Sequence, residues 1–355
     1  METRYLKEQA LNLLKQLVAT PSLSREEAGT AALIENFISG HGLTPQRKFN
    51  NLWLRNNYYS EHKPTLLLNS HHDTVKPNNG WTMDPFQAVI KDGKLFGLGC
   101  NDAGASLVSL LATFIYFHDR RDMKYNIVFS ATGEEESSGK NGIRSILADI
   151  GKIDFALVGE PTGMQLSVAE KGLLVLRCKA NGISGHAARD VGRNAILAAF
   201  KDIQWFSTFQ FPIISEMLGP VKMTVTMIEG GIQHNVIPDS CQFTVDIRTT
   251  DCYSSDEILA MIRKNISSEI VTCSLNLRAS YAPGDHEFVN CARQLGIPTF
   301  GSPTLSDRTF IEAPSVKIGP GRSERSHTAD EYVFLAEVEQ GLDTYIHLID
   351  KFVST

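Results

Sequence analysis

The most constraining feature of the sequence is a set of short apolar runs that stop at glycine, proline or small polar residues. The runs occupy residues 65–68, 127–129, 155–158 and 316–318. Short apolar runs bounded in this way are typical of buried strands. Strands buried on both faces are in turn typical of parallel sheets with helices on either side. We therefore expect an α/β fold with a mostly parallel sheet sandwiched by helices.

Side chains that can bind metal ions or move protons follow these runs. Most stand within a few residues of the end of a run, His327 stands further on after the turn of residues 319–321, and Asp102 stands in the glycine-rich turn 97–104, ahead of an apolar helix expected over residues 107–117. In chain order they are His71, Asp73, Asp102, Glu134, Glu135, Glu160 and His327. In open α/β sheets ligands bind beyond the carboxyl ends of the strands. We therefore expect these acids and histidines to meet at one edge of one sheet.

Each motif also has a plainer interpretation when it is taken alone. A solvated polar turn explains His71 and Asp73, and a helix cap explains Asp102. An acidic surface turn explains residues 134–136, and loop positions explain Glu160 and His327. The joint occurrence is much harder to produce by chance than any one motif, so the pattern as a whole favours a functional site.

The types of side chain indicate the chemistry of this site. Two histidines and three carboxylates without cysteine suit Zn²⁺, with Co²⁺ or Mn²⁺ as further options. Two such ions about 3.5–4 Å apart can activate a shared water and polarise a carbonyl group, and a nearby carboxylate can act as general base. In an extended segment His71 and Asp73 point to one side and His72 to the other. Asp73 can then accept the second ring N–H of His71 and fix its tautomer.

The size and charge of the chain limit its class. At 355 residues it exceeds what one core usually supports, so we expect two domains. Its net charge of -6 argues against nonspecific nucleic-acid binding, which needs a basic field. We expect neither a membrane span of ~20 apolar residues nor a signal peptide. Six scattered cysteines without a Cys-x-x-Cys pair fit reduced thiols, so we expect a cytoplasmic protein.

A second domain is expected inside the first. Its predicted elements follow the order strand, helix, strand, strand, helix, strand, which is the split βαβ layout. They cover residues 173–180, 192–205, 222–228, 241–248, 254–266 and 274–280. Metal-binding residue types resume after this segment, at Asp307 and His327. We therefore expect a first domain of residues 1–170 and 282–355, interrupted by a small domain of residues 171–281.

Two Ser-x-x-Glu patterns predict the starts of helices. Ser24 with Glu27 and Ser254 with Glu257 both have the spacing of a capping box. The first is expected to begin a helix that ends near Gly40, where a glycine can close it.

Taken together, the motifs resemble those of the two-zinc amidohydrolase and metallopeptidase family that includes acetylornithine deacetylase, succinyl-diaminopimelate desuccinylase, aminoacylase and glutamate carboxypeptidase. The resemblance covers essentially the whole chain, and five motifs follow the family's order and approximate spacing. It implies a zinc-exopeptidase-like sheet domain that carries an inserted ferredoxin-like α+β lid, which commonly mediates dimerisation. It implies the following ligands for two Zn²⁺ ions, with the aspartate as the bridge: His71, Asp102, Glu135, Glu160 and His327. It also implies Glu134 as the general base and Asp73 as the residue that steadies His71.

The resemblance further implies substrate contacts within the lid. His186, in Ser-Gly-His, matches a histidine that helps to hold the substrate carbonyl oxygen in dimeric members, and Asn235 matches another substrate contact. Arg248 stands where the family commonly binds a substrate carboxylate, a task that suits a fixed guanidinium fork. A surface salt bridge is an equal alternative for Arg248. Lys171 and Arg308 are candidates for reading an acidic acyl tail, or plain surface charges.

The predicted function is hydrolysis of the amide bond of an N-acyl amino acid. The short length and compact lid look most like acetylornithine deacetylase-type enzymes of arginine biosynthesis, acting on N-acetyl or N-succinyl ornithine or citrulline. The alternatives are a succinyl-diaminopimelate desuccinylase, a di- or tripeptidase with the same site, and a non-catalytic metal-binding protein. The expected cofactors are two Zn²⁺ ions, with Co²⁺ possible. The expected partners are the small substrate and a second copy of the chain, without nucleic acid or membrane.

Overall fold

The computed structural model describes residues 3–189 and 191–354, and only the backbone of residues 274–276. The chain forms two compact units. Unit 1 comprises the chain up to Val168, Tyr281–Phe300 and the chain from Ser306 onward, and unit 2 comprises Ala169–Ser280 and Gly301–Leu305. The breaks fall within two residues of the expected boundaries, but the short return of residues 301–305 to unit 2 was not expected.

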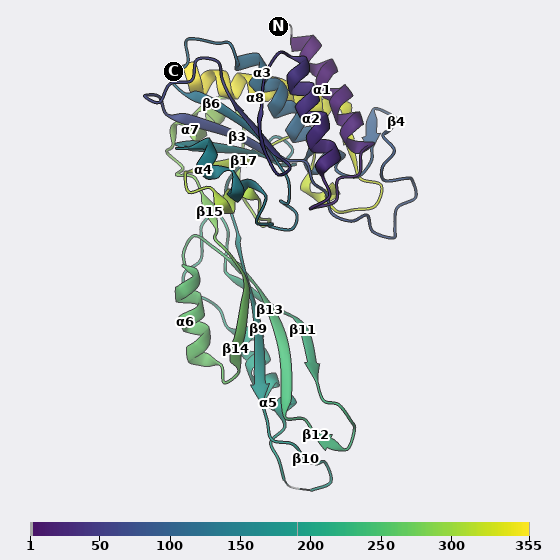
Figure 1. Cartoon of the computed structure of the whole chain (residues 1–355). Coiled ribbons are helices and arrows are strands. Elements are labelled where there is room, and N and C mark those ends of the chain that lie inside the picture. Colours follow the sequence, from purple (N-terminus) through teal and green to yellow (C-terminus); the bar gives the residue numbers. More distant parts are fainter. Residues whose placement is uncertain (1–2, 190, 355) are drawn as a thin grey trace. The chain divides into compact units, whose positions relative to one another are not determined.

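Unit 1 is built on a sheet whose central strands β6, β3, β7 and β17 are parallel (Figure 1). The strand order is β1-β2-β6-β3-β7-β17-β8-β15, and β16 pairs with β8. The strands are β1 Gln46–Lys48, β2 Asn51–Arg55, β3 Thr65–His71, β6 Asn126–Thr132, β7 Phe155–Gly159, β8 Leu166–Glu170, β15 Ser280–Tyr281, β16 Thr299–Ser302 and β17 Ser315–Ile318. Every residue of the four central strands is buried. The predicted α/β fold with a mostly parallel sheet is thus confirmed.

Helices cover both faces of this sheet. The larger hydrophobic cluster contains residues of α1 Thr3–Val18, α2 Ala28–Gly40, α3 Ala105–Phe117, α7 Glu287–Gln294 and α8 Leu335–Ser354. On the other face, a smaller cluster packs against the one-turn helices η2 Ile143–Ser145 and α4 Leu147–Ile150. Successive strand residues point to opposite faces, so Leu66 and Leu68 join the larger cluster while Leu67 joins the smaller one.

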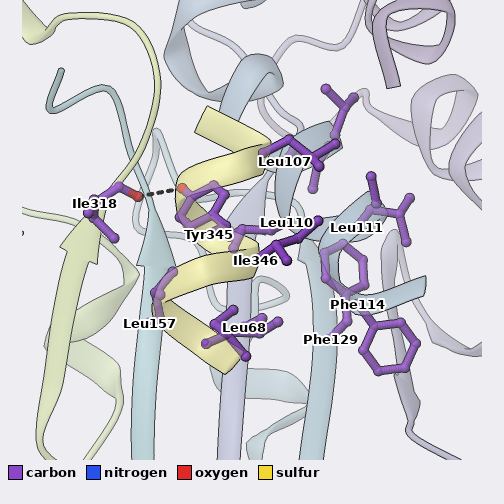
Figure 2. Close-up of a cluster of buried hydrophobic side chains, with 14 of the residues drawn as sticks. Leu68, Leu107, Leu110, Leu111, Phe114, Phe129, Leu157, Ile318, Tyr345 and Ile346 are labelled. Atoms are coloured by element: carbon purple, nitrogen blue, oxygen red, sulfur yellow. Dashed lines mark hydrogen bonds between the residues drawn. The ribbon is translucent and has the colours of Figure 1, made fainter. Parts of the chain in front are cut away.

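The centre of the larger cluster holds the sheet against α3 and α8 (Figure 2). One apolar residue from each central strand faces these helices: Leu68, Phe129, Leu157 and Ile318. Tyr345 of α8 lies fully buried among them, and its hydroxyl donates a hydrogen bond to the Ile318 carbonyl oxygen at 2.6 Å. The strand ends that carry the polar residues are therefore fixed to a close-packed core.

The central helix is unusually apolar. Among the residues that the structure describes, one stretch, Cys100–Phe117, is long and apolar enough to cross a membrane by length and composition, but 89% of it is buried inside the protein. We expected no stretch of this kind. It comprises α3 and the preceding π-turn η1 Cys100–Gly104, and α3 packs against α1 and α8 in the core. A small sheet of β18 Tyr332–Phe334, β5 Lys94–Phe96 and β4 Val89–Lys91 completes unit 1.

Unit 2 has the expected order of elements: β9 Gly172–Asn181, α5 Ala195–Thr208, β11 Lys222–Gly230, β13 Ser240–Thr249, α6 Ser255–Asn265 and β14 Glu269–Leu277. The four strands form an antiparallel sheet in the order β11-β13-β9-β14, the ferredoxin-like arrangement. A separate two-stranded ladder joins β10 Gly185–His186 to β12 Val236–Ile237. The last strand begins and ends earlier than the predicted range of residues 274–280.

The two Ser-x-x-Glu patterns have different outcomes. Ser254 forms a complete capping box with Glu257, as predicted. Ser24 does not, because Arg25 takes a positive φ of 81° and the Ser24 hydroxyl donates to Ser137 instead. The helix begins only at Ala28, so the prediction of a capping box at residues 24–27 was wrong.

Candidate metal centre

Acidic and imidazole groups from five segments meet at the carboxyl edge of the unit 1 sheet. His71 ends β3, Asp102 lies in η1, Glu136 lies in the loop after β6, Glu160 follows β7, and His327 follows the 3-10 turn η4 Ser323–Arg325. His71 Nε2 lies 3.2 Å from Asp102 Oδ1 and 4.0 Å from Glu160 Oε1. His327 Nε2 lies 3.6 Å from Asp102 Oδ2 and 3.1 Å from Glu136 Oε2. Asp102 therefore stands between the two histidines.

The run Glu134-Glu135-Glu136 is oriented differently from our expectation. The sequence suggested Glu134 as the base and Glu135 as a metal ligand. In the structure Glu134 has a positive φ of 56°, and its carboxylate accepts hydrogen bonds from Asn141 N at 3.2 Å and Asn141 Nδ2 at 2.8 Å. Glu136 instead contributes a ligand atom that lies within 4.8 Å of those of His71 and Asp102. The left-handed turn at Glu134 directs its side chain into the loop and brings Glu136 into the cluster.

Asp73 ties the first histidine to this acidic loop. Its carboxylate accepts hydrogen bonds from the backbone N–H groups of Glu135 at 3.1 Å and Glu136 at 3.2 Å. His71 Nδ1 lies 2.9 Å from the Asp73 carbonyl oxygen and 3.5 Å from Asp73 Oδ1. The ring N–H therefore bonds chiefly to the backbone of Asp73, whereas we expected its carboxylate to take that bond. Either partner leaves Nε2 of His71 facing the cluster.

His72 points to the other side of the strand, as the alternation predicts. It is buried, and its Nδ1 and Nε2 atoms lie 2.8 Å from the Thr30 hydroxyl and 2.9 Å from the Asn50 carbonyl oxygen. Burial lowers the pKa of His72 to about 4. It is therefore a neutral structural residue behind the site and is not directed toward the cluster.

A buried polar network lies beneath the strand ends. Asp307 Oδ2 accepts hydrogen bonds from Asn69 Nδ2 at 2.9 Å and from the Thr132 hydroxyl at 2.8 Å, and Ser130 donates to Asn69 Oδ1 at 2.6 Å. Burial raises the pKa of Asp307 to about 6. The network links β3 and β6 two residues before His71 and Glu134. The sequence pattern gave no role to Asn69. It marked Asp307 only as a position where metal-binding residue types resume after the inserted domain.

The charge balance of the cluster fits a bound cation. Burial, together with repulsion from Asp102, raises the pKa of Glu160 to about 8. Burial and repulsion from Glu160 and Glu136 likewise raise the pKa of Glu135. Burial opposes protonation of His71, but its hydrogen bonds to Asp102 and Asp73 raise its pKa well above the usual value. Buried carboxylates that lie this close together repel one another, and a divalent metal ion would offset that repulsion. Carboxylate oxygen and imidazole nitrogen atoms are suitable ligands for such an ion.

Residues predicted to contact the substrate from the lid belong to unit 2. His186 and Asn235 line one hollow together with Ser184 and Gln233, and Ala187 N donates to the Asn235 carbonyl oxygen at 3.0 Å. The ring of His186 accepts a hydrogen bond from Ala188 N at 3.1 Å. These two predicted residues are therefore neighbours: His186 ends β10, and Asn235 directly precedes β12.

The predicted cationic residues are held by local partners. Arg248 forms a two-pronged salt bridge with Asp246, at 2.9 Å from Nε and 3.2 Å from Nη2. Lys171 donates to the Pro220 carbonyl oxygen at 2.9 Å. Arg308 is fully buried, and its guanidinium donates to the carbonyl oxygens of Ser167, Val168 and Ser315. The expectation that Arg308 reads an acyl tail was therefore wrong, because its donors face backbone carbonyls inside the core.

Comparison with known proteins relates the chain to metal-dependent deacylases and peptidases. It is 28% identical to the acetylornithine deacetylase of Proteus mirabilis (strain HI4320), over 96% of both chains. It is 25% identical to succinyl-diaminopimelate desuccinylase 2 of Ruegeria sp. (strain TM1040), over 92% of this chain and 91% of that one.

Solved structures share the fold. An aminopeptidase from Bacillus cereus superposes with a TM-score of 0.77 at 20% identity, over 98% of both chains. A dinuclear metal-binding peptidase of the M20 family from Bacillus subtilis superposes with a TM-score of 0.72 at 16% identity, over 98% of this chain and 97% of that one. A model of peptidase family M20/M25/M40 matches residues 67–351, which span every proposed metal ligand. The chain therefore belongs to peptidase family M20/M25/M40 and is a metallohydrolase of that family.

Proposed function

We propose that the protein hydrolyses the amide bond of an N-acyl amino acid. The observation that carries the proposal is full-length similarity to two deacylases, combined with the clustering of His71, Asp102, Glu136, Glu160 and His327 at the sheet edge. The proposed substrates are N-acetyl or N-succinyl derivatives of ornithine or citrulline, in arginine biosynthesis. N-succinyl-diaminopimelate is an alternative with equal support, because succinyl-diaminopimelate desuccinylases are also among the similar proteins.

The proposed metal ligands differ by one residue from the original prediction. His71 and Glu160 would hold one ion, Glu136 and His327 the other, and Asp102 would bridge both. Zn²⁺ is the favoured metal and Co²⁺ a substitute. When bound, the metal pair would activate a water molecule and polarise the amide carbonyl.

Glu135 is the proposed general base. Its backbone N–H is held by Asp73, and it lies between Glu134, which faces the loop, and Glu136, which faces the cluster. Burial and repulsion from Glu160 and Glu136 raise the pKa of the Glu135 carboxyl, which favours uptake of a proton from the activated water and its transfer to the leaving amine. His186 and Asn235 are proposed to contact the substrate carbonyl and chain, and Arg248 its carboxylate, once Arg248 exchanges Asp246 for the substrate.

The experiment is a hydrolysis panel on protein loaded with Zn²⁺ or Co²⁺, with and without a chelator. The panel contains N-acetylornithine, N-succinylornithine, N-acetylcitrulline, N-succinyl-diaminopimelate and several dipeptides and tripeptides. We expect chelator-sensitive cleavage of at least one N-acyl amino acid. Cleavage of peptides alone would replace the deacylase by a peptidase, the activity that the Bacillus structures suggest. No turnover despite bound metal would favour a binding protein.

We further propose a homodimer formed through unit 2, in the cytoplasm. Strand β11 is an edge strand, and its Met227 and Ile228 are 66% and 59% exposed. On the adjacent helix α5, Leu197 and Phe200 are 63% and 60% exposed. An apolar edge strand that is left uncovered invites pairing with another chain. All six cysteines are free thiols, which fits a reducing compartment. Sedimentation of wild type and Phe200→Glu tests the dimer, since a monomeric wild type would exclude it.

A further inference from the structure

A buried carboxylate ties the turn that carries Asp102 to the loop that carries His327. Glu331 is only 2% exposed, and its Oε1 accepts hydrogen bonds from the backbone N–H groups of Asn101 at 2.8 Å and Asp102 at 3.0 Å. Its own carbonyl oxygen accepts a hydrogen bond from Gly97 N at 3.0 Å. Glu331 therefore holds the backbone of the turn, while the Asp102 carboxylate stays directed toward the two histidines.

Asn101 makes the reciprocal connection, from the turn to the loop. Its side chain is fully buried. Its Oδ1 accepts from Arg322 N at 2.8 Å, and its Nδ2 donates to the Arg322 carbonyl oxygen at 3.1 Å and lies 3.4 Å from the Ser326 hydroxyl. The loop passes close by, since a Cβ added at Gly321 would lie 2.4 Å from Asn101 Oδ1. Ser326 directly precedes His327 in the chain.

We propose that Glu331 and Asn101 are positioning residues that together set the placement of His327 relative to Asp102. The imidazole of His327 is about half exposed, with a side-chain exposure of 53%, so burial does little to fix it. The clamp formed by Glu331 and Asn101 supplies the missing constraint through buried hydrogen bonds at both ends of the loop. This inference rests on the proposed function, because it treats Asp102 and His327 as metal ligands.

The expected effect is larger on one of the two ions. The clamp holds the segments that carry Asp102 and His327, whereas His71 at the end of β3 and Glu160 after β7 are held by the sheet. The ion of His71 and Glu160 would depend on the clamp through Asp102 alone. Partners that orient metal ligands typically change metal affinity by about 10–100-fold when they are removed. Loss of the clamp should therefore weaken binding of the ion held by Glu136 and His327 most, and binding of the ion held by His71 and Glu160 less, through Asp102 alone.

The neighbouring residue Asp330 provides a matched control. Its carboxylate accepts hydrogen bonds from Thr82 N at 2.9 Å, Thr82 Oγ1 at 2.6 Å and Met83 N at 3.3 Å. It thus ties the same loop to a segment without any proposed ligand. A general requirement for a well-folded loop would make Asp330→Ala as harmful to metal binding as the loss of Glu331.

The experiment titrates the metal-free full-length protein with Co²⁺, followed by visible absorption and calorimetry, with thermal unfolding measured in parallel. For Glu331→Leu and Asn101→Ala we expect two Co²⁺ equivalents, one bound about 10–100-fold more weakly than in wild type and with an altered absorption spectrum. Glu331→Gln keeps an acceptor oxygen and should restore near-wild-type affinity. Asp330→Ala should bind both equivalents like wild type, whatever its melting temperature.

The proposal is overturned if the clamp variants melt earlier but bind both Co²⁺ equivalents like wild type, or if Asp330→Ala weakens binding equally. Should Glu331→Leu fail to fold, Asn101→Ala and Asn101→Ser decide the question, because both leave the Glu331 carboxylate and its bonds to the backbone in place. A wild type that binds two Co²⁺ ions but hydrolyses no amide refutes the proposed function alone. Unchanged Co²⁺ affinity in the clamp variants of an active enzyme refutes this inference alone.

Discussion

Replacing Glu134 with alanine should reduce the stability of unit 1 much more than its catalysis. The Glu134 carboxylate is buried and accepts two hydrogen bonds, both from Asn141. Hydrogen bonds to a charged acceptor contribute about 1.5–3 kcal/mol each, and water can partly replace the lost carboxylate, so the expected cost is about 2–4 kcal/mol. At about 2–4 °C per kcal/mol for a unit of this size, the melting temperature should fall by about 5–15 °C.

The assay compares Glu134→Ala, Glu135→Gln and Glu136→Gln by thermal unfolding, bound metal and turnover. Glu134→Ala should keep its metal and, below its melting temperature, most of its kcat. Glu135→Gln should keep its metal and its stability but lose about 10²–10⁴-fold in kcat, as expected for removal of a general base. Glu136→Gln should bind metal less tightly. The reasoning fails if Glu134→Ala unfolds like wild type yet loses turnover with its metal retained, because Glu134 would then be the base after all.

Three further predictions concern pH, metal removal and packing. Between pH 6.5 and about 4 the unfolded chain binds a proton at His72 that the folded protein does not bind. The free energy of unfolding should therefore fall by up to about 3 kcal/mol as the pH falls through this range. The His72→Gln variant should show a shallower fall when its unfolding is followed against pH. In the metal-free protein the pKa of Glu160 is about 8, against 4.5 when unfolded, so the contribution of this group to stability is lost as pH rises between these values. Above pH 6.5, where His72 is neutral in both states, stability should therefore decline toward pH 8. Added Zn²⁺ should abolish the decline, and a flat metal-free profile between pH 6.5 and 8 would contradict this pKa. Leu110→Ala, in the fully buried core, should cost about 2–5 kcal/mol in thermal unfolding, and a cost below 1 kcal/mol would indicate that the core relaxes around the cavity.

The central strands could be predicted because burial on both faces leaves a direct trace in the sequence. The apolar runs at residues 65–68 and 155–158 lie inside β3 and β7, and the residues just beyond them point into the cluster. Unit 2 was predictable for a related reason, since its strands alternate in burial, as β9 does along its whole length. Periodicity of this kind is a property of each strand by itself and needs no knowledge of tertiary contacts.

The errors came from places where tertiary contacts decide the local conformation. The same Ser-x-x-Glu spacing caps a helix at Ser254 but not at Ser24, whose backbone N–H is held by Thr74 and whose hydroxyl contacts Ser137. The roles within residues 134–136 depend on a left-handed turn at Glu134, a conformation that is uncommon for glutamate and leaves no signal in the sequence. The hydrogen bond between Asn69 and Asp307 also left no signal in the sequence, because the two residues are far apart in the chain and only the fold brings them together.

Unit 2 leaves and rejoins unit 1 through strands that are neighbours in one sheet. β8 and β15 are adjacent, and Ala282 N donates to the Val168 carbonyl oxygen at 2.8 Å. The inserted segment of more than a hundred residues therefore begins and ends at adjacent strands, as the loop of a β-hairpin does. Because the two connecting strands are adjacent, the strand register of the unit 1 sheet does not depend on the length or sequence of unit 2. Variation within unit 2, including its length, can therefore occur without disturbing the strand ends that carry the acids and histidines.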